Sequence, residues 1–133
     1  MASILKVDTI TGVATAGSIA VTGEGNSTTT NLQQGLCKCW VNVTGNGFTL
    51  SDNFNASSMT DNAVGRPEVN FTNSMANATY GYSGGAYNRI IGAYATDGAL
   101  TTSSLAVVLV ASDGNFGDLG TNIMGILVNG DLA

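Results

Sequence analysis

A strict alternation of apolar and polar side chains in residues 38–44 constrains the fold of this chain more than any other feature. Cys39, Val41 and Val43 fall on one side of an extended backbone, whereas Trp40 falls on the other. A period of two residues is typical of a β-strand with one buried face and does not fit an α-helix. The segment therefore predicts a half-buried strand, with Trp40 on the face opposite the core.

The alternation repeats along the rest of the chain, between turn signals. Residues 45–47 are Gly-Asn-Gly, which tolerates positive φ, so a hairpin is expected there. The candidate strands are residues 38–44, 47–51, 57–61, 68–71, 79–83, 87–94, 104–111 and 123–129. This spacing predicts an all-β fold, an antiparallel β-sandwich or jelly-roll-like domain. Within it, residues 62–67 form a hairpin loop, residues 104–111 a fully buried central strand, and residues 73–78 at most one helical turn.

Residues 1–36 differ from the rest because they contain few large apolar side chains. Residues 5–10 alternate like a strand, residues 18–22 form a second short one, and residues 23–30 are polar and rich in turn formers. A two-strand unit is marginal in isolation. We therefore expect two parts: an extended N-terminal arm over residues 1–36, for attachment or trimerisation, and a β-sandwich domain over residues 37–133. The alternative is a frayed leader. The arm would act through Leu5, Val7, Ile10, Ile19 and Val21, and Trp40 is the predicted packing anchor of the domain.

Composition argues against catalysis. The 133 residues include no histidine, which removes the commonest general base and metal ligand, and the acidic residues stand singly in turn contexts. Cys37 and Cys39 supply two thiols where zinc needs about four ligands, so two small core residues are the favoured interpretation. Residues 113–118 faintly resemble a calcium loop, but Asp118 stands where Gly is required, which favours a tight turn. We expect no catalytic residue, no cofactor and no metal.

The segment 38–80 also carries an ordered series of residues found in one family. The matching residues are Lys38, Trp40, Val41 and Asn42; Asp52, Phe54, Asn55, Ser57 and Ser58; Thr60, Asp61, Asn62, Val69, Asn70, Phe71 and Thr72; and Met75, Ala78 and Tyr80. In these residues the chain resembles small virion proteins of tailed, often marine, bacteriophages that are usually labelled tail-fibre proteins. It departs from them in the Cys37-x-Cys39 pair and in residues 64–68. The resemblance implies a structural protein of the virion, on the tail or as a capsid decoration.

The expected partners follow from charge and from the resemblance. Only 10% of residues are charged and the net charge is −5, so we expect a subunit that covers much of its surface in an assembly and does not bind nucleic acid. The chain contains no run of about 18 consecutive apolar residues, and its first residues lack the charged start and long apolar core of a signal peptide, so we expect no export by itself. We expect a homotrimer made in the bacterial cytoplasm that joins other virion proteins, of the capsid or the tail. The alternative function is that of a module that binds a host-surface glycan through Tyr80, Tyr82, Tyr87 and Arg66. For the tyrosines, packing between subunits is the competing interpretation.

Overall fold

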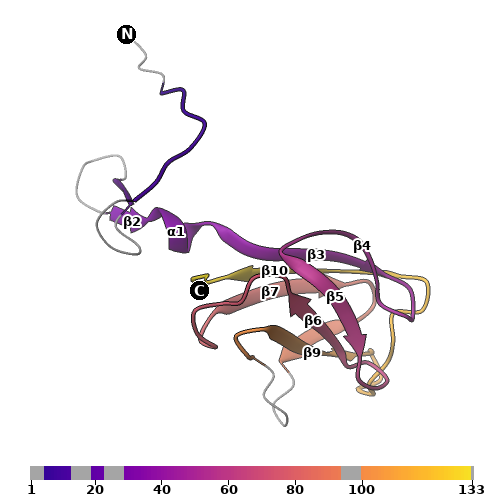
Figure 1. Ribbon diagram of the computed structural model, residues 1–133. Helices are drawn as coiled ribbons and strands as arrows, with labels where there is room; N and C mark the ends of the chain where they lie inside the picture. The colour runs from indigo at the N-terminus through magenta and orange to yellow at the C-terminus, as the bar shows by residue number, and fades with distance from the viewer. Residues whose placement is uncertain (1–4, 13–18, 23–28, 94–99, 133) are drawn as a thin grey trace. The chain divides into compact units, whose positions relative to one another are not determined.

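The structure, a computed structural model, describes residues 5–12, 19–22, 29–93 and 100–132 (Figure 1). The chain divides into two compact units, Met1–Leu36 and Cys37–Ala133. Each unit is described by itself below.

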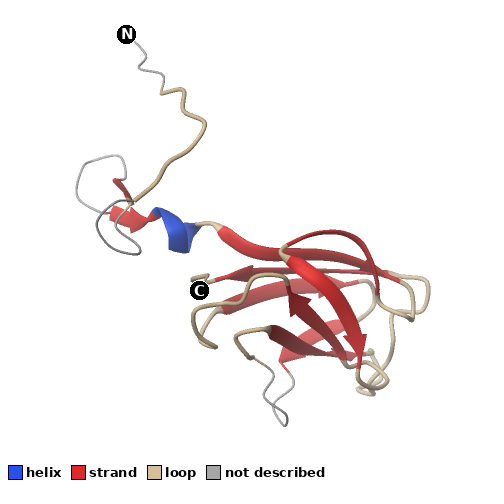
Figure 2. Cartoon of the chain, viewed as in Figure 1, coloured by secondary structure: helices blue, strands red, loops and turns tan. Residues whose placement is uncertain are grey.

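The unit Cys37–Ala133 consists of two antiparallel sheets of four strands each (Figure 1, Figure 2). The strands are β3 (Cys37–Thr44), β4 (Thr49–Phe54), β5 (Ala56–Asp61), β6 (Pro67–Phe71), β7 (Gly81–Ala86), β8 (Ile90–Ala93), β9 (Ser104–Val110) and β10 (Ile123–Asn129). One sheet has the order β4-β3-β10-β7, and the other has the order β5-β6-β9-β8. The predicted all-β class is confirmed, and the arrangement is sandwich-like.

Alternating side chains from both sheets form one core. In β3 the predicted face is buried, while Trp40 is half-buried and Asn42 is exposed. Lys38 is the exception to the alternation, because it lies on the Trp40 side and is only 5% exposed. The other strands contribute Val69 and Phe71 from β6, Leu105, Val107 and Leu109 from β9, and Met124, Ile126 and Val128 from β10. Burial of this apolar surface is the main term that stabilises the unit.

The last strand of the chain lies inside its sheet, between β3 and β7. Its bounds coincide with the predicted strand 123–129, and its register pairs Ile126 with Val41. The predicted strand 104–111 is also confirmed as internal, since β9 lies between β6 and β8. It is not fully buried, however: Leu105, Val107 and Leu109 are inaccessible, and alternate residues are only half-buried. Strands β9 and β10 belong to different sheets, so residues 111–122 cross between sheets.

Most predicted strand boundaries shift by one to three residues, and two of these shifts have a visible local cause. Strand β4 starts at Thr49 because Phe48 has a φ of 47° and belongs to the turn. Strand β8 starts at Ile90 because the chain turns at Asn88, whose φ is 55°, and Tyr94, the predicted last residue of this strand, lies outside the described residues. Strand β7 begins at Gly81, two residues later than expected. The helical turn predicted for residues 73–78 is absent from this described segment, where the Asn77 side chain accepts the Thr79 N–H and so competes with helical hydrogen bonds.

The chain passes from one sheet to the other at Asn55, between β4 and β5. Its φ is 58°, a conformation that Asn tolerates better than most residues. The side-chain amide donates to the carbonyls of Lys38 (3.0 Å) and Asn73 (3.1 Å), and its oxygen accepts the Asn73 N–H at 2.7 Å. One side chain thus fastens the corner to two distant segments.

The unit Met1–Leu36 contains a short hairpin, β1 (Ala20–Thr22) with β2 (Thr29–Asn31), followed by the four-residue helix α1 (Leu32–Gly35). The Leu32 N–H donates to the Ile19 carbonyl at 2.8 Å. The prediction of a strand at residues 5–10 is wrong for the described structure, because these residues form no strand and pair with no described strand. Most of the predicted polar segment 23–30 lies outside the described residues. No helix in the described part of the chain has the length and apolar character needed to cross a membrane.

Candidate functional site

The tyrosines that the sequence grouped as a possible sugar-binding surface are separated by the fold. Tyr80 is 6% exposed, packs edge-to-face on Phe71 with ring centroids 5.7 Å apart, and donates its hydroxyl to the Ser104 carbonyl at 2.7 Å. Burial raises the pKa of Tyr80 to about 12. Tyr82 is half-buried and packs against the core, whereas Tyr87 is 61% exposed. Of these three side chains only Tyr87 lies fully at the surface.

Arg66 lies in the loop between β5 and β6, far in sequence from the surface that it contacts. Its guanidinium stacks over the Phe116 ring, 4.9 Å from the centroid. The neighbouring Gly65 has a φ of 66°, and its N–H donates to the Asp118 carboxylate at 2.6 Å while its carbonyl accepts the Leu109 N–H at 2.8 Å. The predicted hairpin loop is therefore docked on the segment after β9, and Arg66 helps to hold it there.

The docking segment is the one that faintly resembled a calcium loop. Asp113 accepts the Asn115 N–H at 3.0 Å, and hydrogen bonds to Asn115 lower the pKa of the Asp113 carboxyl. Asp118 accepts the Gly65 N–H. The two carboxylates thus act on backbone N–H groups, as expected for turn residues. Among the described residues, no three of His, Cys, Asp and Glu gather in a way that could hold a metal ion.

The two cysteines are free thiols on β3. Cys39 is buried, and desolvation, with a smaller effect of Cys37, raises its pKa to about 12. Cys37 is half-buried and donates its S–H to the Cys39 carbonyl at 3.0 Å. A thiol with so high a pKa stays protonated near neutral pH and is a poor nucleophile. Cys39 acts as a small apolar core residue.

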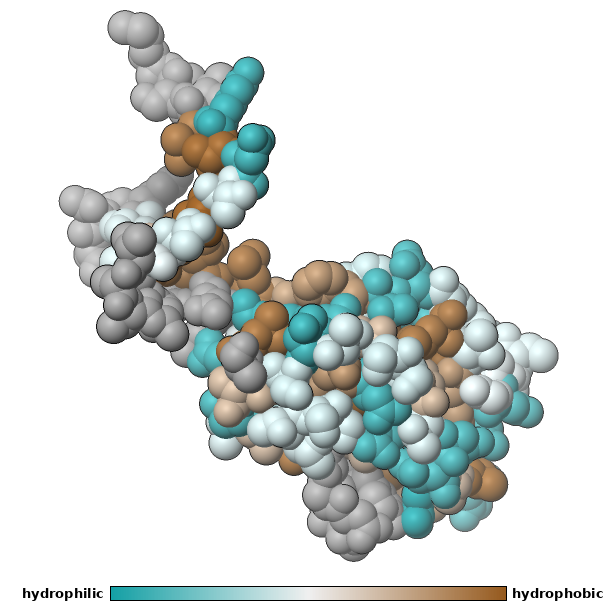
Figure 3. Space-filling model, viewed as in Figure 1, coloured by the Kyte–Doolittle hydropathy of each residue, from teal (hydrophilic) through white to brown (hydrophobic). Residues whose placement is uncertain are grey.

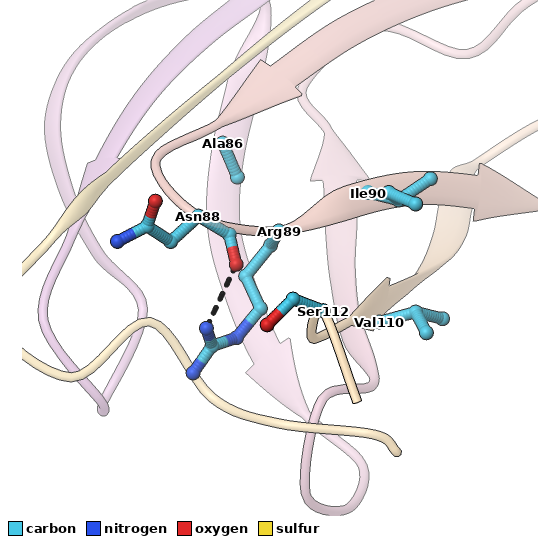
Figure 4. A pocket seen from close by; sticks show the side chains of 6 residues that line it. All are labelled: Ala86, Asn88, Arg89, Ile90, Val110 and Ser112. Atoms are coloured by element: carbon cyan, nitrogen blue, oxygen red, sulfur yellow. Dashed lines mark hydrogen bonds between the residues drawn. The ribbon is translucent and has the colours of Figure 1, made fainter. Parts of the chain in front are cut away.

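An open pocket of about 520 Å³ lies beside the turn between β7 and β8. It is lined by Ala86, Asn88, Arg89, Ile90, Val110 and Ser112 (Figure 4). Arg89 is the one cation among these six, and its guanidinium donates to the carbonyls of Asn88 (2.8 Å), Gly117 (3.3 Å) and Asp118 (3.0 Å). The charged group therefore ties the 117–118 segment to the turn.

Comparison of the chain with protein-family models, with curated proteins and with solved structures gave no match. Function must therefore be argued from the residues and their geometry.

Trp40, the predicted packing anchor, lies on the outer face of its sheet. The β-sheet register places it directly opposite Phe54 on β4 and Leu127 on β10. Phe54 is 50% and Leu127 48% exposed. Trp40 therefore belongs to an apolar row across three strands. On the face of the Cys37–Ala133 unit drawn in Figure 3, hydrophobic and hydrophilic residues are interspersed. Its role as an anchor stays a prediction.

The N-terminal unit exposes the apolar side chains that the sequence assigned to attachment. Leu5 is 81%, Ile10 57%, and Val7 and Val21 just over half exposed, whereas Ile19 is half-buried. The structure does not bring these residues together into a core. Sequence reasoning missed two features of the second unit: the Asn55 corner and the uncharged free edge of β7. The sequence signal for the Asn55 corner was only that Asn tolerates a positive φ. The signal for the edge of β7 was only that residues 81–86 carry no charge.

Proposed function

We propose that this chain is a non-enzymatic structural protein on the exterior of a tailed-phage virion, assembled as a homotrimer with the Met1–Leu36 unit as its attachment arm. The observation that carries the assembly is the exposure of large apolar side chains in this small unit, with Leu5, Val7, Ile10, Val21 and Leu36 all at least half exposed. A unit that cannot bury its own apolar residues gains stability by packing against other chains. The virion location rests on the resemblance of residues 38–80 to small virion proteins.

The sparse charge of the chain supports the same role. Charged residues make up 10% of the sequence, and four of the few cations and anions, Arg66, Arg89, Asp113 and Asp118, are engaged with a ring or with backbone groups. A subunit whose neighbours cover its surface needs less charge for solubility than a free monomer.

Two measurements test the proposal on the full chain. Light scattering after size-exclusion chromatography should give three times 13.4 kDa, or about 40 kDa. An antibody or gold label against the chain, applied to intact particles and viewed by electron microscopy, should mark the head or the tail. A stable monomer would contradict the trimer, and unlabelled particles would contradict the virion location. The position of the label decides between a tail-fibre-like role and a capsid decoration.

A second candidate role is binding of a host-surface glycan, and Tyr87 is the observation that favours it. Its side chain is 61% exposed beside Ile123, whose carbonyl accepts the Tyr87 N–H at 3.1 Å, and amphipathic aromatic side chains suit binding faces. Tyr87→Ala should reduce adsorption of particles to host cells without changing the oligomer, while the matched change Tyr82→Phe should have no effect. Unchanged adsorption by Tyr87→Ala would reject this role.

A further inference from the structure

The four edge strands of the two sheets differ in how they are protected against pairing with another strand. Strand β4 carries Asp52 and a register shift opposite β3, and β5 carries Asp61 and a register shift opposite β6. Bulges and charges of this kind blunt the edges of natural sheets. Strand β7 has neither: its register with β10 is continuous and its sequence, GYSGGA, is uncharged. Strand β8 is also uncharged, but it is only four residues long.

On the side away from β10, here called the β7 edge, the backbone of β7 presents hydrogen-bonding groups that no second described strand pairs with. The bond from the Tyr87 N–H to the Ile123 carbonyl fixes the alternation, so the N–H and C=O groups of Tyr82 and Gly84 point away from β10. Within the described residues, β10 is the only strand that pairs with β7, and Ala86 at the end of β7 forms an isolated bridge with Arg89. Tyr82 and Ala86 are half-buried at this side of the core, where an added strand would cover them.

The same chain contains a strand-like segment without a strand partner. Residues 5–10 read Leu-Lys-Val-Asp-Thr-Ile and alternate with period two at the start, yet they form no strand among the described residues. Leu5, Val7 and Ile10 are 81%, 53% and 57% exposed. The segment and β7 are both six residues long. Its one cation and one anion, Lys6 and Asp8, fall on the opposite side from Leu5 and Val7.

We propose that residues 5–10 of one copy add as a strand to the β7 edge of a second copy. Leu5 and Val7 then lie on the core side beside Tyr82 and Ala86, and Lys6 and Asp8 face solvent with Ser83. Backbone hydrogen bonds supply affinity and the alternating side chains fix the register. In a closed ring each copy donates one strand and accepts one, so no β7 edge is left free. The inference rests on the proposed self-assembly and names the surfaces that perform it.

Disulfide cross-linking of the full chain tests which residues meet. In a Cys37→Ser, Cys39→Ala background, Ser83→Cys is combined with Lys6→Cys or with Asp8→Cys, on the same predicted face. We expect at least one of these pairs to give cross-linked chains of twice 13.4 kDa, about 27 kDa, or larger on a non-reducing gel. The matched control, Ser83→Cys with Val7→Cys, places the thiols on opposite faces and should stay monomeric on the gel. A disulfide that closes within a single chain would overturn the second-copy assignment.

A proline variant tests whether the pairing holds the assembly. Val7→Pro removes a ladder hydrogen bond in a segment that packs on no core in the single chain, so the circular dichroism of the folded unit should be unchanged. We expect its mass in solution to fall from about 40 kDa to 13.4 kDa, whereas the control Lys6→Ser keeps the wild-type mass. A Val7→Pro trimer without cross-linking at Ser83 would overturn this inference and leave the proposed trimer intact. A wild-type monomer would overturn both.

Discussion

The corner residue Asn55, between β4 and β5, should contribute strongly to stability through its side-chain hydrogen bonds and its backbone conformation, and two substitutions separate these two contributions. Asn55→Ala removes both the side-chain hydrogen bonds and a residue that tolerates a φ of 58°. Asn55→Gly removes the same hydrogen bonds but accepts the backbone conformation without strain. The difference between the two variants therefore measures the conformational cost alone.

The expected magnitudes follow from the geometry. Four hydrogen bonds of the Asn55 side chain are lost, with the Lys38 carbonyl and with the N–H, carbonyl and side-chain amide of Asn73, at distances of 2.7 to 3.1 Å. At about 0.5 kcal/mol each, the lower end of the net range because water can replace them at this half-exposed corner, they amount to about 2 kcal/mol. An alanine held at positive φ costs about 1 kcal/mol more. We expect the free energy of unfolding to fall by about 2 kcal/mol in Asn55→Gly and about 3 kcal/mol in Asn55→Ala.

Equilibrium unfolding in urea, followed by the fluorescence of Trp40, measures both values from the midpoint at constant slope. Asn88 is the matched control, because its φ is 55° but it lies in an exposed turn. Asn88→Gly should be nearly neutral and Asn88→Ala should cost only about 1 kcal/mol. If Asn55→Gly lost less than about 0.5 kcal/mol, the side-chain bonds would not hold the corner. If Asn55→Ala were no worse than Asn55→Gly, the backbone conformation would carry no cost.

Three further predictions concern the packed loop, the thiols and the pH dependence. Gly65→Ala should lower the free energy of unfolding by more than about 2 kcal/mol, because φ is 66° and the added Cβ would lie 2.6 Å from the Gly117 nitrogen. The control Gly114→Ala, at a φ of 82° with nothing within 4 Å of the added Cβ, should cost about 1 kcal/mol. Equal losses for the two variants in urea unfolding would refute the steric contribution at Gly65. Cys37 should react with a thiol reagent at pH 8 well before Cys39, because a pKa of about 12 keeps the Cys39 thiol protonated until the chain unfolds. Equal rates of modification of the two thiols would contradict the burial of Cys39. The folded-state pKa values of Cys39 and Tyr80 are about 12, above the ordinary values of 9.0 and 10.0, so the unfolded chain loses these protons first as the pH rises. The stability that the two protonated groups contribute is therefore complete below pH 9 and is lost as the pH rises toward 12. A thermal midpoint that stays constant from pH 8 to pH 11 would contradict this prediction.

The sequence predicted best what depends on neighbouring residues. A half-buried strand needs one apolar face, so β3 was visible from its alternation, and β10 from an apolar run that ends in Asn-Gly. Sheet order was not visible, because the pairing of β3 with β10 joins residues from 79 (Ile123 with Thr44) to 92 (Asn129 with Cys37) positions apart and leaves no local signal. Nor was the burial of Tyr80, which follows a polar stretch and precedes glycine, where a surface position is expected. Its hydroxyl finds the Ser104 carbonyl only after β9 has packed.

Local sequence shows aromatic side chains readily but does not show which backbone groups lie at a sheet edge. A tyrosine cluster is conspicuous in a sequence, but alternation sends Tyr82 toward the core and folding buries Tyr80, so the expected surface reduces to Tyr87. An unprotected edge strand is hard to detect in a sequence, because it is marked only by the absence of protective features. Strands β4 and β5 have such features, a charged residue and a register shift each, and β7 has neither. On the solvent face of β7 the space around Gly85 is open, since a Cβ added there would meet nothing within 4 Å. Among the described residues, 5–10 form no strand and β7 pairs with a strand on one side only, and the self-assembly proposed above would join the two.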